Sequence, residues 1–262
     1  MIPKKIHYCW FGGNPLPELA VKCIESWKKY CPDYEIIEWN ESNYDISSAP
    51  LYVRQAYEAK KWGFVPDYIR LDLIYKYGGI YLDTDVEIIK PFDSLLEFKG
   101  FAGFEDKKNV ALGLGFGAEK SNEIIRVLRD SYTEKQFLKE DGSLDLTPSP
   151  VFNTATLLEL GLIQNGATQS IDDFSFFGQD YFCPKDNITG KINITANTFS
   201  IHHYDGSWLD EEMFYIRSVR LKLAKFLPGR VAHFLSYVFG FTKTRGILKM
   251  PEALINHKRQ KK

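Results

Sequence analysis

Two aspartates separated by one residue, Asp83 and Asp85, have the spacing in this chain that most directly suggests chemistry. On an extended backbone, residues i and i+2 project to the same side, so the two carboxylates would emerge together. Such groups repel one another unless a cation lies between them, and Mg²⁺ and Mn²⁺ bind carboxylates together with phosphate oxygens. The pair predicts a metal–diphosphate site, and the alternative is a solvated loop at the end of a strand.

The residues before this pair predict a helix that aims two further polar side chains at the same place. Over 66–77, proline stands at the first helical position and apolar residues recur at a spacing of four. Two glycines at 78–79 end the helix, and the apolar run 80–82 is typical of a buried strand. Asp67 and Arg70 lie three residues apart on one helix face, so they could reach the two aspartates.

The composition is that of a globular protein. Of the 262 residues, 44% are hydrophobic and 15% aromatic, which is enough for a large core. We expect neither a bilayer span, because no apolar run is long enough, nor a secretory signal, because the N-terminus is too short and too mixed in polarity. The cysteines lack the spacing of a zinc site or a disulfide framework, so we expect free thiols in a reducing compartment at Cys9, Cys23, Cys31 and Cys183.

Charge is distributed unevenly along the chain, whose formal net charge is −1. Residues 216–262 hold twelve Lys or Arg and one acid, whereas residues 1–215 hold 21 basic and 33 acidic residues. Basic residues beside large apolar ones describe an amphipathic helix at a membrane surface. The alternatives are a helix packed on the body of the protein and a basic patch for nucleic acid, and the lack of a recognisable nucleic-acid-binding motif argues against the second.

The start of the chain predicts a parallel strand pair whose ends form a ligand site. Strand, helix and strand patterns with breakers between them occupy 4–10, 16–30 and 34–39. Two strands joined by a helix are parallel, and ligands of such sheets bind beyond the carboxyl ends of the strands. Trp10, Gly12 and Gly13 would lie there, where the indole could stack on a nucleobase and the glycines could let the backbone approach it. A tryptophan in the core is the alternative.

Two adjacent histidines could complete the metal site. The stretch 199–202 predicts a strand, and His202 and His203 would point to opposite faces, so we expect at most one of them to bind metal. A neutral imidazole beside two carboxylates suits Mn²⁺, whereas a histidine satisfied within the core is the alternative. Ser207 and Trp208 come next, in a turn, and offer a hydroxyl and an indole N–H.

Two stretches between these motifs suggest a wall and a loop of the site. Residues 111–118 alternate small and apolar residues, as a tightly packed strand or a pocket wall would. They lack the Lys-Ser/Thr ending of a phosphate loop. Residues 134–150 are polar and interrupted, which is typical of a mobile loop that could face an acceptor.

Four parts of the sequence occur in the same order in a known family: 2–13, 26–27 with 31–39, 67–86 and 201–208. The chain resembles bacterial members of glycosyltransferase family 32, which share a Gly-Gly-x-Tyr-x-Asp-x-Asp sugar-binding motif. It is also distantly similar to the glucosyltransferase domains of large clostridial toxins. The resemblance covers about residues 1–210 and excludes the basic tail. Family members commonly have serine before the helix aspartate, where this chain has Pro66.

The resemblance implies a GT-A type α/β fold, with a Rossmann-like mixed central sheet flanked by helices and, here, a helical basic C-terminal appendage. It also implies a nucleotide-sugar donor, expected to be UDP-linked, a Mn²⁺ (or Mg²⁺) ion, and transfer with retention at the anomeric carbon. In these terms, 1–215 would be the catalytic domain and 216–262 a membrane-association element.

Matched residue by residue, the family's donor contacts fall on positions already described. Trp10 would stack on the base, with the Cys9 backbone beside it. Asp67 and Arg70 would hold the donor sugar and the diphosphate, and Asp83 would contact ribose and sugar hydroxyls.

The resemblance places the metal and the leaving group at the remaining motifs. Asp85 would ligate the metal, and His202 or His203 would supply the third protein ligand. Ser207 and Trp208 would reach the leaving diphosphate.

We therefore expect a retaining hexosyltransferase that builds a capsule, exopolysaccharide or lipopolysaccharide on a glycan or lipid-linked glycan acceptor. It would work in the cytoplasm, peripheral to the inner face of the cell membrane and bound to that anionic surface. No second carboxylate is assigned as a covalent nucleophile, so front-side attack by the acceptor hydroxyl is the expected route. The alternatives are a metal-dependent nucleotidyltransferase or sugar-nucleotide hydrolase, and a non-catalytic nucleotide-sugar binder. We expect no nucleic-acid partner.

Overall fold

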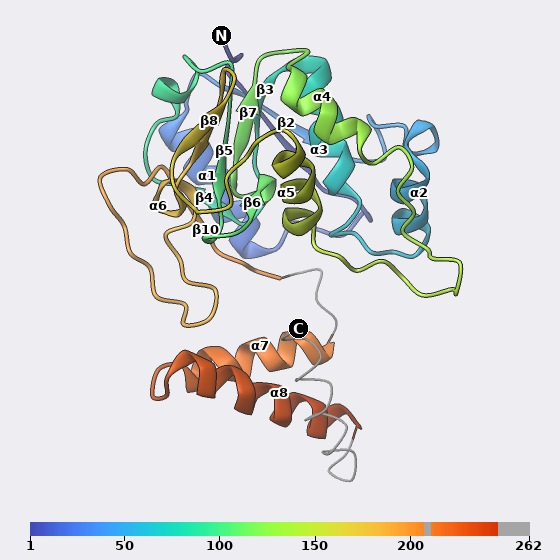
Figure 1. Ribbon diagram of the computed structural model, residues 1–262, viewed down its shortest axis with the longest axis vertical. Coiled ribbons are helices and arrows are strands. Elements are labelled where there is room, and N and C mark those ends of the chain that lie inside the picture. The colour runs from blue at the N-terminus through green and yellow to red at the C-terminus, as the bar shows by residue number, and fades with distance from the viewer. Residues whose placement is uncertain (207–210, 246–262) are drawn as a thin grey trace. The chain divides into compact units, whose positions relative to one another are not determined.

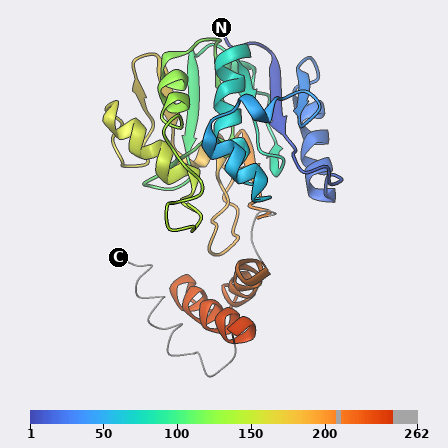
Figure 2. The same ribbon diagram turned by 90° about the vertical axis from the view of Figure 1, so that its right-hand side faces the viewer.

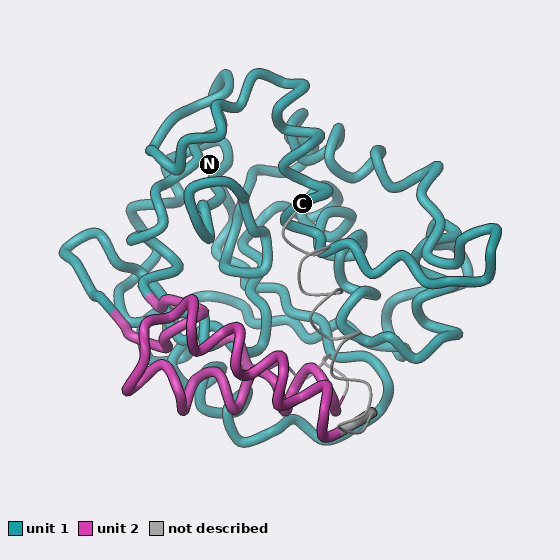
Figure 3. Tube along the Cα trace, turned by 60° about the horizontal axis from the view of Figure 1, so that its bottom comes forward, with its two compact units in different colours: residues 1–184, 193–203 teal, residues 185–192, 204–262 magenta. Residues whose placement is uncertain are grey.

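The computed structural model describes residues 1–206 and 211–245. The sites predicted at Ser207 and Trp208 lie outside the described residues, as does the basic stretch 246–262. The chain divides into two units, coloured separately in Figure 3: unit 1 is 1–184 with 193–203, and unit 2 is 185–192 with 204–262. The domain boundary expected after residue 215 lies within helix α7 (Glu211–Leu223) of unit 2.

Unit 1 is built on an eight-stranded sheet in the order β2-β1-β3-β7-β5-β9-β8, with β6 paired to β5. A separate two-stranded sheet joins β4 and β10. The strands are β1 (Lys5–Cys9), β2 (Glu35–Trp39), β3 (Gly79–Tyr81), β4 (Val86–Ile88), β5 (Gly100–Phe104), β6 (Val110–Ala111), β7 (Phe116–Ala118), β8 (Gln169–Ile171), β9 (Phe174–Phe177) and β10 (Ser200–His202).

Five strands of the main sheet run in one direction. β1 pairs in parallel with both β2 and β3, β3 and β5 are both antiparallel to the β7 strand between them, and β5 pairs in parallel with β9. The carboxyl ends of these five strands therefore meet at one edge of the sheet, where α/β proteins bind ligands. The parallel pair predicted at the start of the chain is confirmed, in a register from Lys5↔Glu35 to Cys9↔Trp39.

Helices cover both faces of the main sheet (Figures 1 and 2). Alternate residues of β1 mark the two faces. Tyr8 packs edge-on against Trp27 of α1 (Glu18–Tyr30), whereas His7 stacks on Tyr77 of α3 (Pro66–Tyr77). The predicted α/β fold class is confirmed, with a mixed central sheet between helices. The helices of unit 1 are α1 (Glu18–Tyr30), α2 (Leu51–Glu58), α3 (Pro66–Tyr77), α4 (Glu123–Asp130), α5 (Ser149–Glu159) and α6 (Gln179–Phe182).

Helix α3 has the predicted bounds, with a proline in its first turn and Gly78 at its end in a positive-φ conformation (φ 65°). The predicted apolar stripe is only partly buried, because its last member, Tyr77, is 46% exposed. The helix instead buries polar residues as well as apolar ones, since it packs on the sheet, on α2 and on α4. Its buried charged side chains are Asp67, Arg70 and Asp72.

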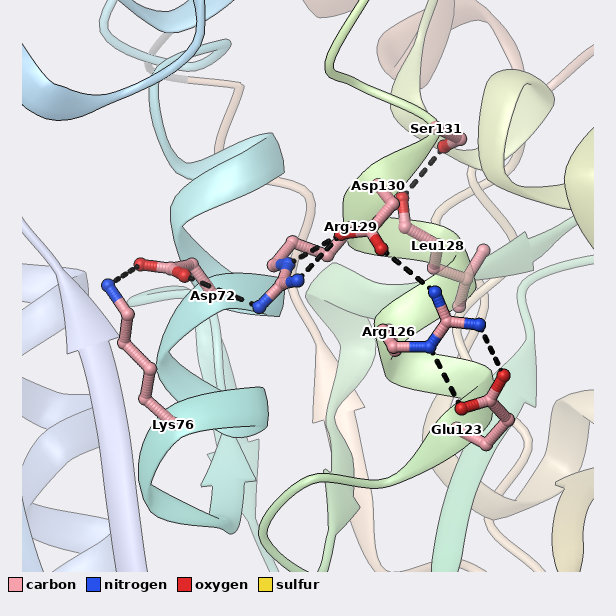
Figure 4. Close-up of polar contacts among 8 residues, drawn as sticks. All are labelled: Asp72, Lys76, Glu123, Arg126, Leu128, Arg129, Asp130 and Ser131. Carbon is pink, nitrogen blue, oxygen red and sulfur yellow. Dashed lines mark hydrogen bonds and ion pairs between the residues drawn. The ribbon is translucent and has the colours of Figure 1, made fainter.

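The buried carboxylate of Asp72 links α3 to α4 and to the loop after β2. It accepts hydrogen bonds from Lys76 Nζ at 2.7 Å and from the Tyr44 hydroxyl at 3.1 Å. Arg129 of α4 approaches it to 4.0 Å and continues through Asp130 into a chain of ion pairs along α4 (Figure 4). Only 4% of the Asp72 side chain is exposed, against 55% of that of Lys76. The carboxylate is therefore the structural centre of this network.

We expect Asp72→Ala to lower the free energy of unfolding by about 3 kcal/mol, because it leaves partly buried donors without their acceptor. Lys76→Ala, which removes an exposed partner of the same carboxylate, should cost less than about 1 kcal/mol. Urea unfolding of both variants measures the difference. Equal losses would contradict the central role of Asp72.

Unit 2 contains a pair of packed helices, α7 (Glu211–Leu223) and α8 (Gly229–Arg245). They come so close at Gly240 that a Cβ there would lie 2.0 Å from Cγ1 of Ile216. The segment 185–192 belongs to the same unit, and Arg220 of α7 donates a hydrogen bond to the Asn187 carbonyl at 3.0 Å. Within the described residues, no helix is long and apolar enough to cross a bilayer.

Candidate metal and nucleotide-sugar site

The two aspartates lie in the turn that joins the two sheets. The strand pairing of β3 with β1 extends to Leu82, whose N–H donates to the His7 carbonyl, and the Asp83 N–H donates to the Gly113 carbonyl at 3.2 Å. A further hydrogen bond from the Val86 N–H to the Asp83 carbonyl closes the turn, after which β4 begins. Asp83 and Asp85 thus leave the main sheet at the edge where its parallel strands end.

His202 completes a cluster with these aspartates. It is the last residue of β10 and pairs with Val86 of β4, which places it next to Asp85. Its Nε2 lies 3.1 Å from Oδ1 of Asp85, and ligand atoms of Asp83, Asp85 and His202 all lie within 4.8 Å of one another. Two carboxylates and an imidazole form a donor set that fits Mn²⁺, and Mg²⁺ less well because of the nitrogen ligand.

His203 faces away from this cluster, as expected for adjacent residues at a strand end. Its Nε2 lies 2.7 Å from Oε2 of Glu87, and its N–H donates to the Asp85 carbonyl. The structure therefore brings His202, and not His203, to the two aspartates. His203 instead connects the end of β10 to Asp85 and Glu87, the two residues that flank Val86.

Arg70 connects helix α3 to the cluster. Its Nη2 donates to Oδ1 of Asp67 at 3.0 Å, its Nε donates to the Pro66 carbonyl, and its Nη1 lies 3.6 Å from Oδ2 of Asp83. Asp67 in turn accepts a hydrogen bond from the Tyr52 hydroxyl at 3.2 Å. The side chains of Asp67 and Arg70 are only 4% and 5% exposed, whereas that of Asp83 is 31% exposed. The pair lies directly behind Asp83, and its contact with a donor sugar stays a prediction.

The pKa values of the site residues are shifted by burial and by neighbouring charged groups. Burial raises the pKa of Asp83, Asp85 adds to this, and Arg70 and His202 oppose it. Burial also raises the pKa of Asp67 to about 6, although Arg70 pulls it down. For His202, burial alone would lower the pKa, but the adjacent carboxylate of Asp85 raises it above its ordinary value. A divalent cation among these groups would favour their ligating forms.

A wall of the site comes from the glycine-rich stretch 111–118. It is a strand interrupted by a turn: β6 ends at Ala111, the 3₁₀ helix η3 spans Leu112–Leu114, and β7 comes after it. A Cβ on Gly113 would lie 2.1 Å from Oδ2 of Asp83 and 3.0 Å from Nη1 of Arg70. The Asp83 carboxylate and the Arg70 guanidinium therefore occupy the space that a side chain at position 113 would need.

We expect Gly113→Ala to displace the Asp83 carboxylate and to weaken Mn²⁺ binding at least about tenfold, since the ligands must keep their mutual distances. Gly178→Ala is the matched control, because a Cβ there would meet only ordinary contacts, 3.4 Å or more away. Isothermal titration with Mn²⁺ measures both. Unchanged affinity in Gly113→Ala would contradict the role of Gly113.

Glu105 is a further acidic residue at this edge that the sequence-based prediction missed. It comes directly after β5, and β5 runs in the direction of β3, so Glu105 and Asp83 leave the sheet on the same side. Burial raises the pKa of Glu105 to about 7, Asp106 adds to the effect, and His202 opposes it. The available signal was an acidic pair immediately after a buried strand, the same signal that identified Asp83 and Asp85.

The raised pKa of Glu105 predicts that the stability of the protein decreases as the pH rises. A carboxyl group with an ordinary pKa of 4.5 and a folded value of about 7 stabilises the fold below the lower value, and this contribution is lost as the pH rises through the higher one. Between about pH 5 and pH 8, the free energy of unfolding of the metal-free wild type should fall by about 2–3 kcal/mol relative to Glu105→Gln.

Urea unfolding at both pH values measures this difference. Glu25→Gln, which changes an exposed carboxylate on α1, should keep the wild-type pH dependence. If Glu105→Gln also keeps it, the assignment of the titration to Glu105 is wrong.

The predicted base-binding residues surround the carboxyl end of β1. The Trp10 N–H donates to the Trp39 carbonyl, and the Trp10 indole donates to the Asn14 carbonyl at 2.6 Å. Gly12 has φ 94°, and a Cβ there would lie 2.8 Å from the Trp62 ring, so a side chain would not fit.

Gly13 also has a positive φ (67°) and open space around it. The Cys9 side chain is 6% exposed and belongs to the core, so only its backbone is available at this edge.

Comparison with known proteins agrees with this site. Residues 17–102 match the family model described as the glycosyltransferase sugar-binding region containing the DXD motif. The matched region includes α3 and both aspartates. The predicted resemblance to glycosyltransferases with this motif is confirmed.

The curated relatives share only part of their length with this chain. Inositol phosphoceramide mannosyltransferase 3 of Schizosaccharomyces pombe is 35% identical over 101 residues, which are 37% of this chain and 28% of the relative. Subversion of eukaryotic traffic protein A of Legionella pneumophila is 26% identical over 171 residues, 54% of this chain and 26% of the relative. The chain thus spans little more than a quarter of the length of these relatives.

Solved structures similar to the chain include two glycosyltransferases. The PaToxG glycosyltransferase is 22% identical with a TM-score of 0.47, and the match covers 60% of this chain and 69% of that one. A glycosyltransferase involved in glycosylation of the major capsid of PBCV-1 is 11% identical with a TM-score of 0.43, over 84% and 99% of the two chains.

Proposed function

We propose that this chain, which carries the DXD sugar-binding region of a family 32-like glycosyltransferase, transfers a hexose from a nucleotide sugar to a glycan or lipid-linked glycan acceptor. The observation that carries the proposal is the cluster of Asp83, Asp85 and His202 at the ligand-binding edge of the sheet. Its ligand atoms lie close enough together to bind one divalent ion. The positively charged guanidinium of Arg70 lies next to Asp83.

The residues of the site support loss of a nucleoside diphosphate. When bound by Asp83, Asp85 and His202, Mn²⁺ or Mg²⁺ would neutralise the charge that develops on the leaving diphosphate. Arg70 holds Asp83 in its ligating position and reduces the repulsion between the two aspartates. Trp10, at the end of β1, would receive the base, as the family resemblance implies.

We propose that the donor is a UDP-sugar and that transfer retains the anomeric configuration through front-side attack. One relative is named as a mannosyltransferase of inositol phosphoceramide, so GDP-mannose belongs among the donors to be tested. The carboxylate of Glu105 also lies at this edge. A glycosyl adduct trapped on Glu105 or on another carboxylate would overturn the front-side route.

We also propose that the acceptor is lipid-linked and that the protein works at the inner face of the cell membrane in the synthesis of a capsule, exopolysaccharide or lipopolysaccharide. Two observations support this. Residues 216–262 carry twelve basic residues and one acid, which suits an anionic surface. The relative from Schizosaccharomyces pombe is named for a lipid acceptor.

The test is a panel of UDP-glucose, UDP-galactose, UDP-N-acetylglucosamine and GDP-mannose with Mn²⁺. A cognate donor at about 100 times its dissociation constant should stabilise the protein by about 2.7 kcal/mol in thermal unfolding. Asp85→Ala should abolish this stabilisation and lower donor turnover at least about 100-fold, because it removes a metal ligand. NMR of the product would report its anomeric configuration.

Asp173→Ala is the matched control, since Asp173 is exposed and its carboxylate pairs with the exposed Lys99. It should keep wild-type stabilisation and turnover. Full turnover by Asp85→Ala would contradict the metal role, and consumption of a nucleoside triphosphate in place of a nucleotide sugar would favour a nucleotidyltransferase.

A further inference from the structure

The turn between α7 and α8 holds a phenylalanine out in solvent. Phe226 is 86% exposed, the highest value among the described large hydrophobic residues, with Met1 next at 85%. The turn is nonetheless regular: the N–H groups of Phe226 and Leu227 donate to the Leu223 carbonyl at 3.0 and 2.9 Å, and the Val231 N–H donates to the Pro228 carbonyl. The hydrogen-bonded backbone thus holds Phe226 in a position where its side chain is exposed to solvent.

Positive charges surround this phenylalanine. Lys222 and Lys225 precede it and Arg230 comes after it, all with exposed side chains, and Val231 beside them is 43% exposed. No acidic residue occurs between 213 and 251. Asp186 of the segment 185–192 contributes a negative charge to unit 2, where it interacts with Arg220 of α7. We call residues 222–231 the basic turn.

This combination fits an anionic bilayer better than a protein groove. An exposed aromatic ring gains by entering the interfacial layer of a bilayer, while lysine and arginine keep their charged ends among the lipid headgroups. Each basic residue near an anionic leaflet raises affinity about fivefold.

We propose that the basic turn inserts Phe226 into the interfacial layer of an anionic membrane, while Lys222, Lys225 and Arg230 contact lipid phosphates and carboxylates. The inference rests on the proposed function, for which it identifies the surface that would serve membrane association. Its contact with lipid does not depend on glycosyl transfer.

The experiment is co-sedimentation of the full chain with vesicles of phosphatidylcholine, alone or with about 30% phosphatidylserine, at low and high salt. Wild type should pellet with the anionic vesicles and much less with the neutral ones. Phe226→Ser should weaken pelleting at least about tenfold, and Lys225→Gln with Arg230→Gln should remove most of its salt dependence.

Phe214→Ser is the matched control, because Phe214 is also exposed (55%) but lies on α7 away from the turn. It should bind within about twofold of wild type. Circular dichroism and donor thermal shifts should be the same for both serine variants, which separates this test from that of the transferase site.

Equal pelleting of wild type and Phe226→Ser would overturn the proposal, and so would a wild type that pellets with neither vesicle. A wild type that only self-associates, with Phe226→Ser monomeric, would overturn it in favour of a contact between copies of this chain.

Discussion

A guanidinium buried behind the sheet edge is the constraint on which the site depends. Arg70 is covered almost completely, yet it faces carboxylates from two different elements, Asp67 on its own helix and Asp83 at the end of β3. A buried charge without partners is costly, so helix, strand end and wall must form together for Arg70 to be tolerated. Gly113 provides the space in which Arg70 and Asp83 meet.

The sheet topology explains why residues far apart in sequence converge. Five strands point their carboxyl ends to one edge, and three of them place a residue of the site just past that end: Trp10 after β1, Asp83 after β3 and Glu105 after β5. The small β4–β10 sheet adds His202 from the side. Catalytic groups in such folds are placed by strand ends, which leaves the loops free to vary.

Much of this arrangement was predictable from local sequence. The helix 66–77, its glycine stop, the acidic pair and the parallel strands at the start all depend on short-range patterns, and the structure has them as predicted. The choice between His202 and His203 required the β4–β10 register, which no local pattern encodes. Likewise, Gly113 gave only a hint of close packing, because the atoms it must avoid belong to residues 30 and 43 positions earlier in the sequence.

The apolar stripe of α3 also shows what local sequence patterns cannot predict. Periodicity predicted burial through Tyr77, but it could not predict that other faces of the helix would be covered too, with Asp67, Arg70 and Asp72 inside. The burial of a charged side chain can be predicted only when the partners that compensate its charge are known. Asp72 pairs with Lys76 one helical turn later on α3, but its other partners lie on α4 and in the loop after β2.

The antiparallel pair of β4 and β10 has a consequence for how the site is assembled. It unites the acidic turn at 83–85 with a histidine more than a hundred residues later. The sugar-binding region 17–102 thus contains both carboxylates but not the imidazole. A three-ligand ion would bind only after the chain has closed this long loop, and it would stabilise the closed form. Metal binding at this site would therefore report that β4 and β10 have paired.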